Sequence, residues 1–113
     1  MFSRLFGRSS SSVDASTAAA LIADGKAMPL DVREKHEWDA GHIGGARHIP
    51  LASLATRLEA KALPKDRTVI CVCHSGLRSS RARSLLERNG YQALNLSGGM
   101  RRWQAAGLPV TTR

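Results

Sequence analysis

The sequence is poor in aromatic side chains and in acidic charge. Beyond the first eight positions its Phe, Trp and Tyr residues are Trp38, Tyr91 and Trp103, and none of these alternates with basic residues. This scarcity argues against a base-stacking surface for nucleic acid. The 9 Asp and Glu residues are outnumbered by 17 Lys and Arg residues, which gives a formal net charge of +8. A surface of this sign attracts anions, so we expect a small anionic substrate and no nucleic acid.

Long apolar runs are also missing. Nothing in the chain approaches the roughly 20 apolar residues of a membrane span. The basic start, Met1–Arg8, lacks the apolar run of a signal peptide. The two cysteines, Cys71 and Cys73, lie too close together in an extended strand for a comfortable disulfide. Free thiols suit a reducing compartment, so we expect a cytoplasmic protein with no membrane span.

The length of 113 residues is enough for one domain that buries a core without disulfides or structural metals. A run of four serines, Ser9–Ser12, is low in complexity and predicts a flexible lead-in over residues 1–12. One folded domain is then expected over residues 13–113.

Short apolar segments alternate with amphipathic ones along the rest of the chain. Strands are expected over Met28–Val32, Ala46–Ile49, Thr68–Val72 and Ala93–Leu96. Helices are expected over Ala15–Ala23, around Leu51–Leu58 and Ala82–Leu86, and over Met100–Ala106. This alternation predicts an α/β fold with a mostly parallel sheet covered by helices on both faces.

The segment after the expected strand Thr68–Val72 combines a cysteine with a turn. It consists of Cys73, His74, Ser75, Gly76, Leu77, Arg78 and Ser79. Loops in this position present ligands at the carboxyl edge of a parallel sheet. Gly76 permits backbone angles that turn successive N–H groups toward one anion, and the next helix directs its positive end the same way. We therefore predict that Cys73 is a nucleophile and that the six residues after it bind the substrate or its anionic product.

The amount of stabilisation that the thiolate needs can be estimated. Lowering a cysteine pKa from about 8.5 to about 7 requires roughly 2 kcal/mol. A helix terminus supplies typically about 0.3 to 1 kcal/mol, so the loop amides and a nearby cation such as Arg78 must supply much of the rest. Arg78 is expected either to bind the oxyanion of a donor or to steady the loop.

Four segments resemble, in order, the signatures of rhodanese-homology domains. They are Leu30–Glu34, Gly41–Pro50, the loop Cys73–Ser79, and Leu96–Met100 with Trp103 followed by Ala106–Val110. The resemblance runs from about Val13 to Val110. It implies a rhodanese-like α/β domain with a five-stranded, mostly parallel sheet flanked by helices on both faces.

The resemblance also implies a reaction. By this resemblance the chain would be a thiosulfate sulfurtransferase-like enzyme. Its Cys73 would take a sulfane sulfur from a donor such as thiosulfate and become a persulfide. A thiol or cyanide acceptor would then remove the sulfur, without a metal or organic cofactor. Asp31 and Arg33 are expected to support the loop rather than react. His74 and Leu77 replace residues that are often basic or polar in this family, which lowers the positive charge expected around the sulfur.

Two other functions fit the same loop. A cysteine phosphatase or arsenate reductase would use a similar oxyanion cradle. In those phosphatases five residues separate the cysteine from the arginine, whereas four separate Cys73 from Arg78 and six separate Cys71 from Arg78. A sulfur-carrier or interaction module would instead receive persulfide from a sulfur-relay protein.

Other cysteine and histidine residues are expected to be structural. Cys71 should pack inside the sheet. His42 and His48 form no compact four-ligand pattern with the cysteines, so no metal site is predicted.

Overall fold

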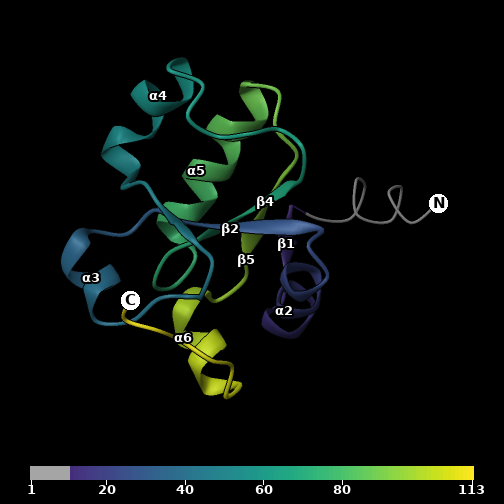
Figure 1. Cartoon of the computed structure of the whole chain (residues 1–113), viewed down its shortest axis with the longest axis vertical. Coiled ribbons are helices and arrows are strands. Elements are labelled where there is room, and N and C mark those ends of the chain that lie inside the picture. The colour runs from purple at the N-terminus through teal and green to yellow at the C-terminus, as the bar shows by residue number, and fades with distance from the viewer. Residues whose placement is uncertain (1–10) are drawn as a thin grey trace.

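A five-stranded, all-parallel sheet organises the computed structural model, which describes residues 11–113 (Figure 1). The strand order is β1-β5-β4-β2-β3. The strands are β1 (Ser12–Val13), β2 (Ala27–Asp31), β3 (Arg47–His48), β4 (Thr68–Val72) and β5 (Ala93–Leu96). The helices are α2 (Ala15–Ala23), α3 (Lys35–Asp39), α4 (Leu51–Glu59), α5 (Leu77–Arg88) and α6 (Gly99–Ala105). The α/β class and the five-stranded parallel sheet predicted above are confirmed.

Helices cover both faces of this sheet. Figure 1 shows α4 and α5 on one side and α2 and α6 on the other. One apolar core lies beneath α4 and α5 and includes Leu54, Leu86 and Leu30. A second core lies beneath α2 and α6 and includes Ala18, Met100 and Ile70. A sheet covered in this way needs strands that are apolar on both faces, which explains the short continuous apolar runs in the sequence.

The alternation of β4 decides which side chains can meet the helices on each side. Val69, Cys71 and Cys73 belong to the core under α4 and α5, whereas Ile70 and Val72 belong to the core under α2 and α6. Successive side chains of a strand point to opposite faces. The two cysteines therefore lie on the α5 side of the sheet, as their spacing predicts.

The charged stretch after β2 forms a short helix, α3, that the hydrophobic pattern does not predict. It begins in a capping box, in which the side chains of Glu34 and Glu37 each accept a hydrogen bond from the other's backbone N–H. Such a cap satisfies donors that are otherwise free at the start of a helix. The helix forms from this polar signal rather than from an apolar face.

The predicted lead-in over residues 1–12 falls mostly outside the described residues and stays a prediction. The described chain begins with Ser11, and β1 starts at Ser12 beside Asn95 of β5. No helix within residues 11–113 is long and apolar enough to cross a membrane. The cytoplasmic location expected from the sequence also stays a prediction.

Candidate active site

Strand β4 delivers Cys73 to the carboxyl edge of the sheet. The strand ends at Val72, whose carbonyl oxygen accepts a hydrogen bond of 2.9 Å from the N–H of Val32. Cys73 is the next residue, and only 1% of it is exposed. Its sulfur therefore lies below the surface, where the chain turns from the sheet toward α5.

The loop folds back over the sulfur. The backbone N–H of Gly76 donates to Cys73 Sγ at 3.1 Å. Gly76 adopts a φ of 113°, which L side chains rarely adopt, and it is the residue immediately before α5. The turn therefore depends on glycine, and it brings the start of α5 against the sulfur.

Hydrogen bonds favour the anionic form of this sulfur. Burial acts to raise the pKa of Cys73, but the Ser79 hydroxyl and the backbone N–H groups of Ser79, Gly76 and Ser75 lower it, and the net effect is a lowered pKa. Ser79 stands in the first turn of α5, so its N–H is one of the donors that no helical carbonyl accepts. The predicted combination of loop amides and a helix terminus is present around Cys73.

Asn95 is a site residue that sequence reasoning missed. Its Oδ1 accepts a hydrogen bond of 2.5 Å from the Ser79 hydroxyl, and its Nδ2 donates to the Gly76 carbonyl at 3.2 Å. Ser79 Oγ also lies 3.3 Å from Cys73 Sγ. The hydroxyl has one proton and two neighbours that can accept it, so it can bond Asn95 beside a thiol and turn to the sulfur beside a thiolate.

A signal for Asn95 exists in the sequence. Asn95 alternates with the apolar residues of β5, and Ala93 belongs to the core under α5 while Leu96 belongs to the opposite one. Strand alternation therefore puts Asn95 on the same face as Cys71 and Cys73. A polar residue on a buried face, near the carboxyl end of a neighbouring strand, marks a group with a partner at the site.

Helix α6 supports the loop from the other side. The N–H of Met100 donates to the Cys73 carbonyl at 2.9 Å, and that of Arg101 donates to the His74 carbonyl at 3.1 Å. Gly99 makes this approach possible. A Cβ atom added there would lie 2.4 Å from the Cys73 carbonyl oxygen, and the φ of Gly99 is 57°. The loop backbone is thus held by α6 as well as by Asn95.

Arg78 pairs with α3. Its two terminal nitrogens bond the two carboxylate oxygens of Glu37 at 2.7 and 2.9 Å. The side-chain hydrogen bond from Arg78 lowers the pKa of Glu37 to about 2 against the opposing effect of burial, and the same bond raises the pKa of Arg78. Of the two roles expected for Arg78, this geometry matches the steadying of the loop, because the guanidinium is already occupied by a carboxylate.

Asp31 and Arg33 form a separate buried pair. Arg33 Nη2 lies 2.8 Å from Asp31 Oδ2 and also donates to the Gly41 carbonyl at 2.8 Å. The side-chain hydrogen bonds of Asp31 go to Arg33 and not to the Cys73 loop. The pair joins the end of β2 to the segment after α3, and Arg33 also helps to lower the pKa of Glu37, the carboxylate that pairs with Arg78.

Three loop residues, His74, Ser75 and Leu77, are exposed to solvent. Leu77, the first residue of α5, is 79% exposed. The sequence assigned all three to the binding loop. The structure places their backbones in the loop and their side chains at its outer rim.

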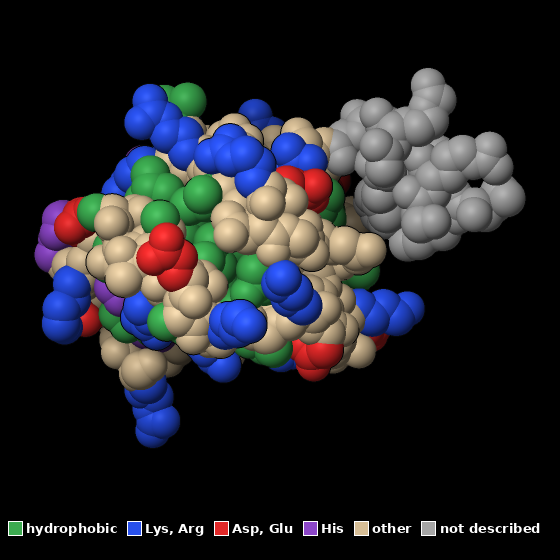
Figure 2. Space-filling model, turned by 90° about the horizontal axis from the view of Figure 1, so that it is seen from above, with side chains coloured by type: hydrophobic (Ala, Val, Ile, Leu, Met, Phe, Trp, Pro, Cys, Tyr) green, Lys and Arg blue, Asp and Glu red, His purple; other side chains and the backbone are tan. Residues whose placement is uncertain are grey.

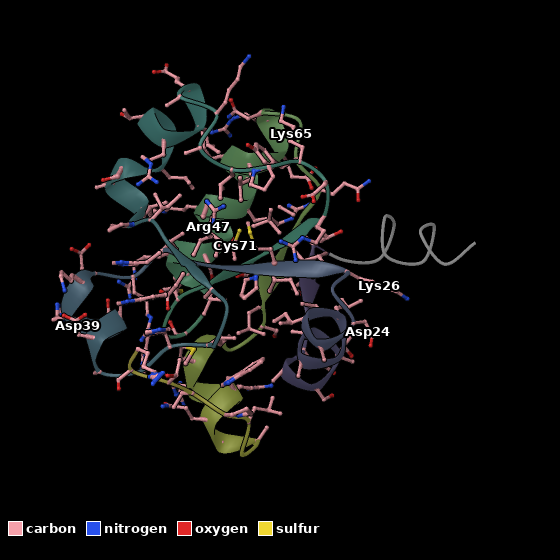
Figure 3. All side chains as sticks on the ribbon, in the orientation of Figure 1. Asp24, Lys26, Asp39, Arg47, Lys65 and Cys71 are labelled. Carbon is pink, nitrogen blue, oxygen red and sulfur yellow. The ribbon has the colours of Figure 1, made fainter. Side chains whose placement is uncertain are left out.

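The other cysteine and the histidines have structural surroundings. Cys71 is fully buried beneath α5 (Figure 3), and burial strongly raises the pKa of its thiol although Arg83 acts in the opposite direction. His42 and His48 both stack on the indole of Trp38. Within residues 11–113, no three side chains of the His, Cys, Asp or Glu type gather as possible metal ligands.

Comparison with known proteins gives a consistent family match. A family model for the rhodanese-like domain matches residues 14–106. A protein named "Sulfurtransferase" from Allochromatium vinosum is 35% identical over 100 residues, which cover 87% of this chain and 92% of that protein. The protein YqhL of Bacillus subtilis, named as uncharacterized, is 42% identical over 79 residues, which cover 69% of this chain and 61% of YqhL. The chain therefore spans less than two thirds of the length of that relative.

A solved structure has the same fold. The crystal structure of a rhodanese-related protein from Thermoplasma volcanium superposes with a TM-score of 0.81 at 30% sequence identity. The match covers 90% of this chain and 98% of that one.

Proposed function

Because this chain belongs to the rhodanese-like domain family, we propose that it transfers sulfane sulfur through a persulfide on Cys73. The observation that carries the proposal is the position of Cys73 Sγ under the Gly76 N–H and beside the Ser79 hydroxyl. The fixed Gly76 N–H stabilises negative charge without reorganising during the reaction, and the Ser79 hydroxyl adds a donor by a rotation of its O–H alone.

The loading step uses the thiolate as a nucleophile. Cys73 Sγ attacks the outer, sulfane sulfur of a donor such as thiosulfate. A new bond forms between Sγ and this sulfur, the sulfur–sulfur bond of thiosulfate breaks, and sulfite leaves with its electron pair. The product is the anionic Cys73 persulfide, whose terminal charge then lies among the loop amides.

The unloading step regenerates the enzyme. A thiolate or cyanide acceptor attacks the outer sulfur of the persulfide. The bond between that sulfur and Cys73 Sγ breaks, and Cys73 leaves as a thiolate. Because the lowered pKa of Cys73 makes its thiolate a better leaving group, the same hydrogen bonds support both halves of the cycle.

The arginine geometry disfavours the phosphatase alternative. An oxyanion cradle for phosphate needs a guanidinium that faces the bound anion, whereas both terminal nitrogens of Arg78 bond Glu37. The spacing from Cys73 to Arg78 is also one residue short of the phosphatase pattern. Both observations support a smaller cradle that holds a single outer sulfur.

Intact mass spectrometry tests the proposal. The protein is incubated with thiosulfate, separated from excess reagent and weighed before and after treatment with a reducing thiol. We expect the mass of one added sulfur atom, which the thiol removes and which peptide mapping assigns to Cys73. If neither thiosulfate nor cysteine persulfide adds a sulfur, the proposed function is wrong.

A further inference from the structure

The rim of the Cys73 loop carries an apolar side chain that the reaction does not require. Leu77 is 79% exposed, and the other large hydrophobic side chain that is exposed within residues 11–113 is Val110, at 41%. Leu77 follows Gly76, whose N–H bonds the reactive sulfur at 3.1 Å. An exposed leucine at this point does nothing to attract a small dianion. It can gain free energy only when another apolar surface covers it.

Cations without carboxylate partners lie next to this leucine. Arg81 is exposed and stands one helical turn after Leu77 on α5, so the two side chains share a face of the helix. Arg101 is exposed at the start of α6, and its N–H is bonded to the His74 carbonyl of the loop. Neither arginine takes part in any of the ion pairs within the described part of the chain.

Arg78, which directly follows Leu77, has a different charge balance. It is neutralised by Glu37, and Glu34 lies close enough to affect the pKa of Arg78. The uncompensated positive charge next to Leu77 therefore comes from Arg81 and Arg101 rather than from Arg78. We call the surface made by His74, Leu77, Arg81 and Arg101 the loop rim.

The geometry points to the loop rim as the docking surface for an acidic protein that exchanges sulfur with Cys73, an inference that rests on the proposed function. Leu77 would contact an apolar residue beside the partner's cysteine, and Arg81 and Arg101 would face its carboxylates. Only 1% of Cys73 is exposed, so the partner must present its cysteine on a protruding segment that reaches past the rim.

A second copy of this chain fits the surface poorly. A two-fold contact through Leu77 would bring the same patch of both molecules together, so that the unpaired Arg81 and Arg101 of each copy would meet their equivalents. The net charge of +8 adds to this repulsion. A partner of opposite charge is therefore favoured.

The transfer step is balanced without a further reagent. The partner's cysteine thiolate attacks the outer sulfur of the Cys73 persulfide and forms a bond to it. The bond from that sulfur to Cys73 Sγ breaks, Cys73 leaves as a thiolate, and the partner becomes the persulfide. No net oxidation occurs, and the reverse reaction loads Cys73.

Synthetic thiol peptides test the two components of docking separately. The first probe has Asp and Glu around a Leu-Cys pair, the second replaces its Leu with Ser, and the third replaces its acids with Lys and Arg. Each is mixed with the persulfidated protein, and the second-order rate of sulfur transfer is followed by mass. Every rate is divided by that peptide's rate with glutathione persulfide, which corrects for differences in thiol pKa.

We expect the acidic Leu peptide to react about tenfold faster than its Ser counterpart, the effect of covering part of one leucine. Leu77→Ser should bring this ratio close to one, whereas the matched Val110→Ser should leave it unchanged. The combined change Arg81→Ser and Arg101→Ser should remove the preference for the acidic over the basic peptide. Arg57→Ser with Arg88→Ser makes the same charge change away from the rim and should preserve that preference.

The control arginines matter because positive charge is spread widely. Figure 2 shows Lys and Arg side chains scattered over the end of the molecule formed by α4 and α5. If the distant pair of arginines had as large an effect as the rim pair, general surface charge would explain the result and the docking surface would be wrong.

A binding measurement separates failure of docking from failure of the chemistry. The same peptides with Ser in place of Cys are added to the unloaded protein, and backbone amide shifts are followed by NMR. If the acidic Leu peptide shifts the amide signals of residues 74–81 and 101 and the other two peptides do not, the loop rim is a docking surface even if Cys73 fails to gain sulfur. A loaded Cys73 with equal peptide rates and no such shifts would overturn the docking proposal and leave the proposed function intact. The docking proposal would also be overturned if the three peptides reacted equally and the protein instead bound anionic lipid vesicles through Leu77, so that Leu77→Ser abolished vesicle binding.

Discussion

Cys71 and Cys73 differ by two positions, face the same side of the sheet and contribute to the same apolar core, yet their environments favour opposite protonation states. Burial raises the pKa of Cys71, and no hydrogen-bond donor lowers it, although Arg83 acts in that direction. Cys73 is also buried, but donors from Ser79, Gly76 and Ser75 lower its pKa overall. Burial alone does not decide the reactivity of a cysteine; the donors that accompany it do.

The difference arises from where the strand ends. Within β4, the backbone N–H groups bond neighbouring strands, so none is free to bond the Cys71 sulfur. At Cys73 the chain leaves the sheet, and the N–H groups of the turn and of the first turn of α5 are free to point at one atom. One strand thus supplies a packing residue and a reactive residue in succession.

Replacing each cysteine by serine in turn should give the largest effect on sulfur loading. Cys73→Ser should abolish sulfur loading, because serine at this position offers no persulfide. Cys71→Ser should retain most of the loading and lose about 1 to 3 kcal/mol of stability, the effect of a buried hydroxyl among apolar neighbours. Intact mass after thiosulfate and urea unfolding measure the two quantities. Loading of the Cys73→Ser protein on Cys71 would reverse the assignment.

Disturbing the loop from α6 should come next. Gly99→Ala puts a Cβ 2.4 Å from the Cys73 carbonyl oxygen at a φ of 57°. The loop or α6 must therefore shift, and we expect a loading rate lower by more than about tenfold, because the donors around the sulfur lose their alignment. Gly44→Ala is the control, since a Cβ there meets nothing within 4 Å. The rate of sulfur loading and the thermal unfolding temperature are measured for both variants. Equal loading rates in Gly99→Ala and Gly44→Ala would contradict the role of Gly99.

The Ser79 and Asn95 side chains should have an intermediate effect. Ser79→Ala removes the hydroxyl donor, and Asn95→Ala removes the groups that hold this hydroxyl and the Gly76 carbonyl. We expect Ser79→Ala to raise the pKa of Cys73 and to slow loading by about tenfold, the usual effect of one hydrogen bond to a charged group. Asn95→Ala should slow loading by loosening the turn at Gly76, without raising the pKa of Cys73, because the Ser79 hydroxyl remains free to bond the sulfur. Ser80→Ala is a matched control, because Ser80 is exposed. The pH dependence of loading distinguishes a changed pKa from simple destabilisation, since only the former moves the midpoint upward.

The ion pair with α3 should matter least. Arg78→Ala should slow loading by thiosulfate by a few-fold, and Arg88→Ala, about 15 Å further along α5, should change it less. Glu37→Gln should resemble Arg78→Ala, because either change releases the loop from α3. The loading rate should also fall with added salt, since part of the attraction for a dianion is long-range. If Arg78→Ala and Arg88→Ala slowed loading equally, the net charge of the protein rather than the position of Arg78 would determine the loading rate.

Much of this site follows from local sequence patterns. The strand that stops at Cys73, the glycine three residues later and the helix after it predict the loop and its nucleophile without any tertiary information. Strand alternation marks Asn95 as a polar residue on a buried face, but local patterns place neither Asn95 nor Glu37 beside the loop. They come from β5 and α3, and they reach the loop only because β5 lies beside β4 and α3 packs near the start of α5. Contacts of this kind depend on strand order, which the pattern of apolar residues does not specify.

For Leu77 the sequence predicts the position of the backbone but not the exposure of the side chain. Its place in the sequence predicts a residue of the binding loop, and its backbone has that position, but its side chain lies 79% exposed at the rim. An apolar residue at the start of an amphipathic helix can face either the core or the solvent. In this structure, after the left-handed turn at Gly76, Leu77 faces the solvent.

The most direct test of the contrast between the two cysteines is the rate of alkylation by iodoacetamide as a function of pH, assigned to Cys71 and Cys73 by peptide mapping. Glu37 has its pKa lowered to about 2, so its ion pair with Arg78 stays intact near neutral pH and the profile reports the thiols. In the native protein Cys73 should react first, with a midpoint below the value of about 8.5 that both thiols should show in denaturant. Cys71 should stay unmodified until the protein unfolds. A native Cys73 midpoint at or above the denatured value, or alkylation of Cys71 before Cys73, would contradict this account.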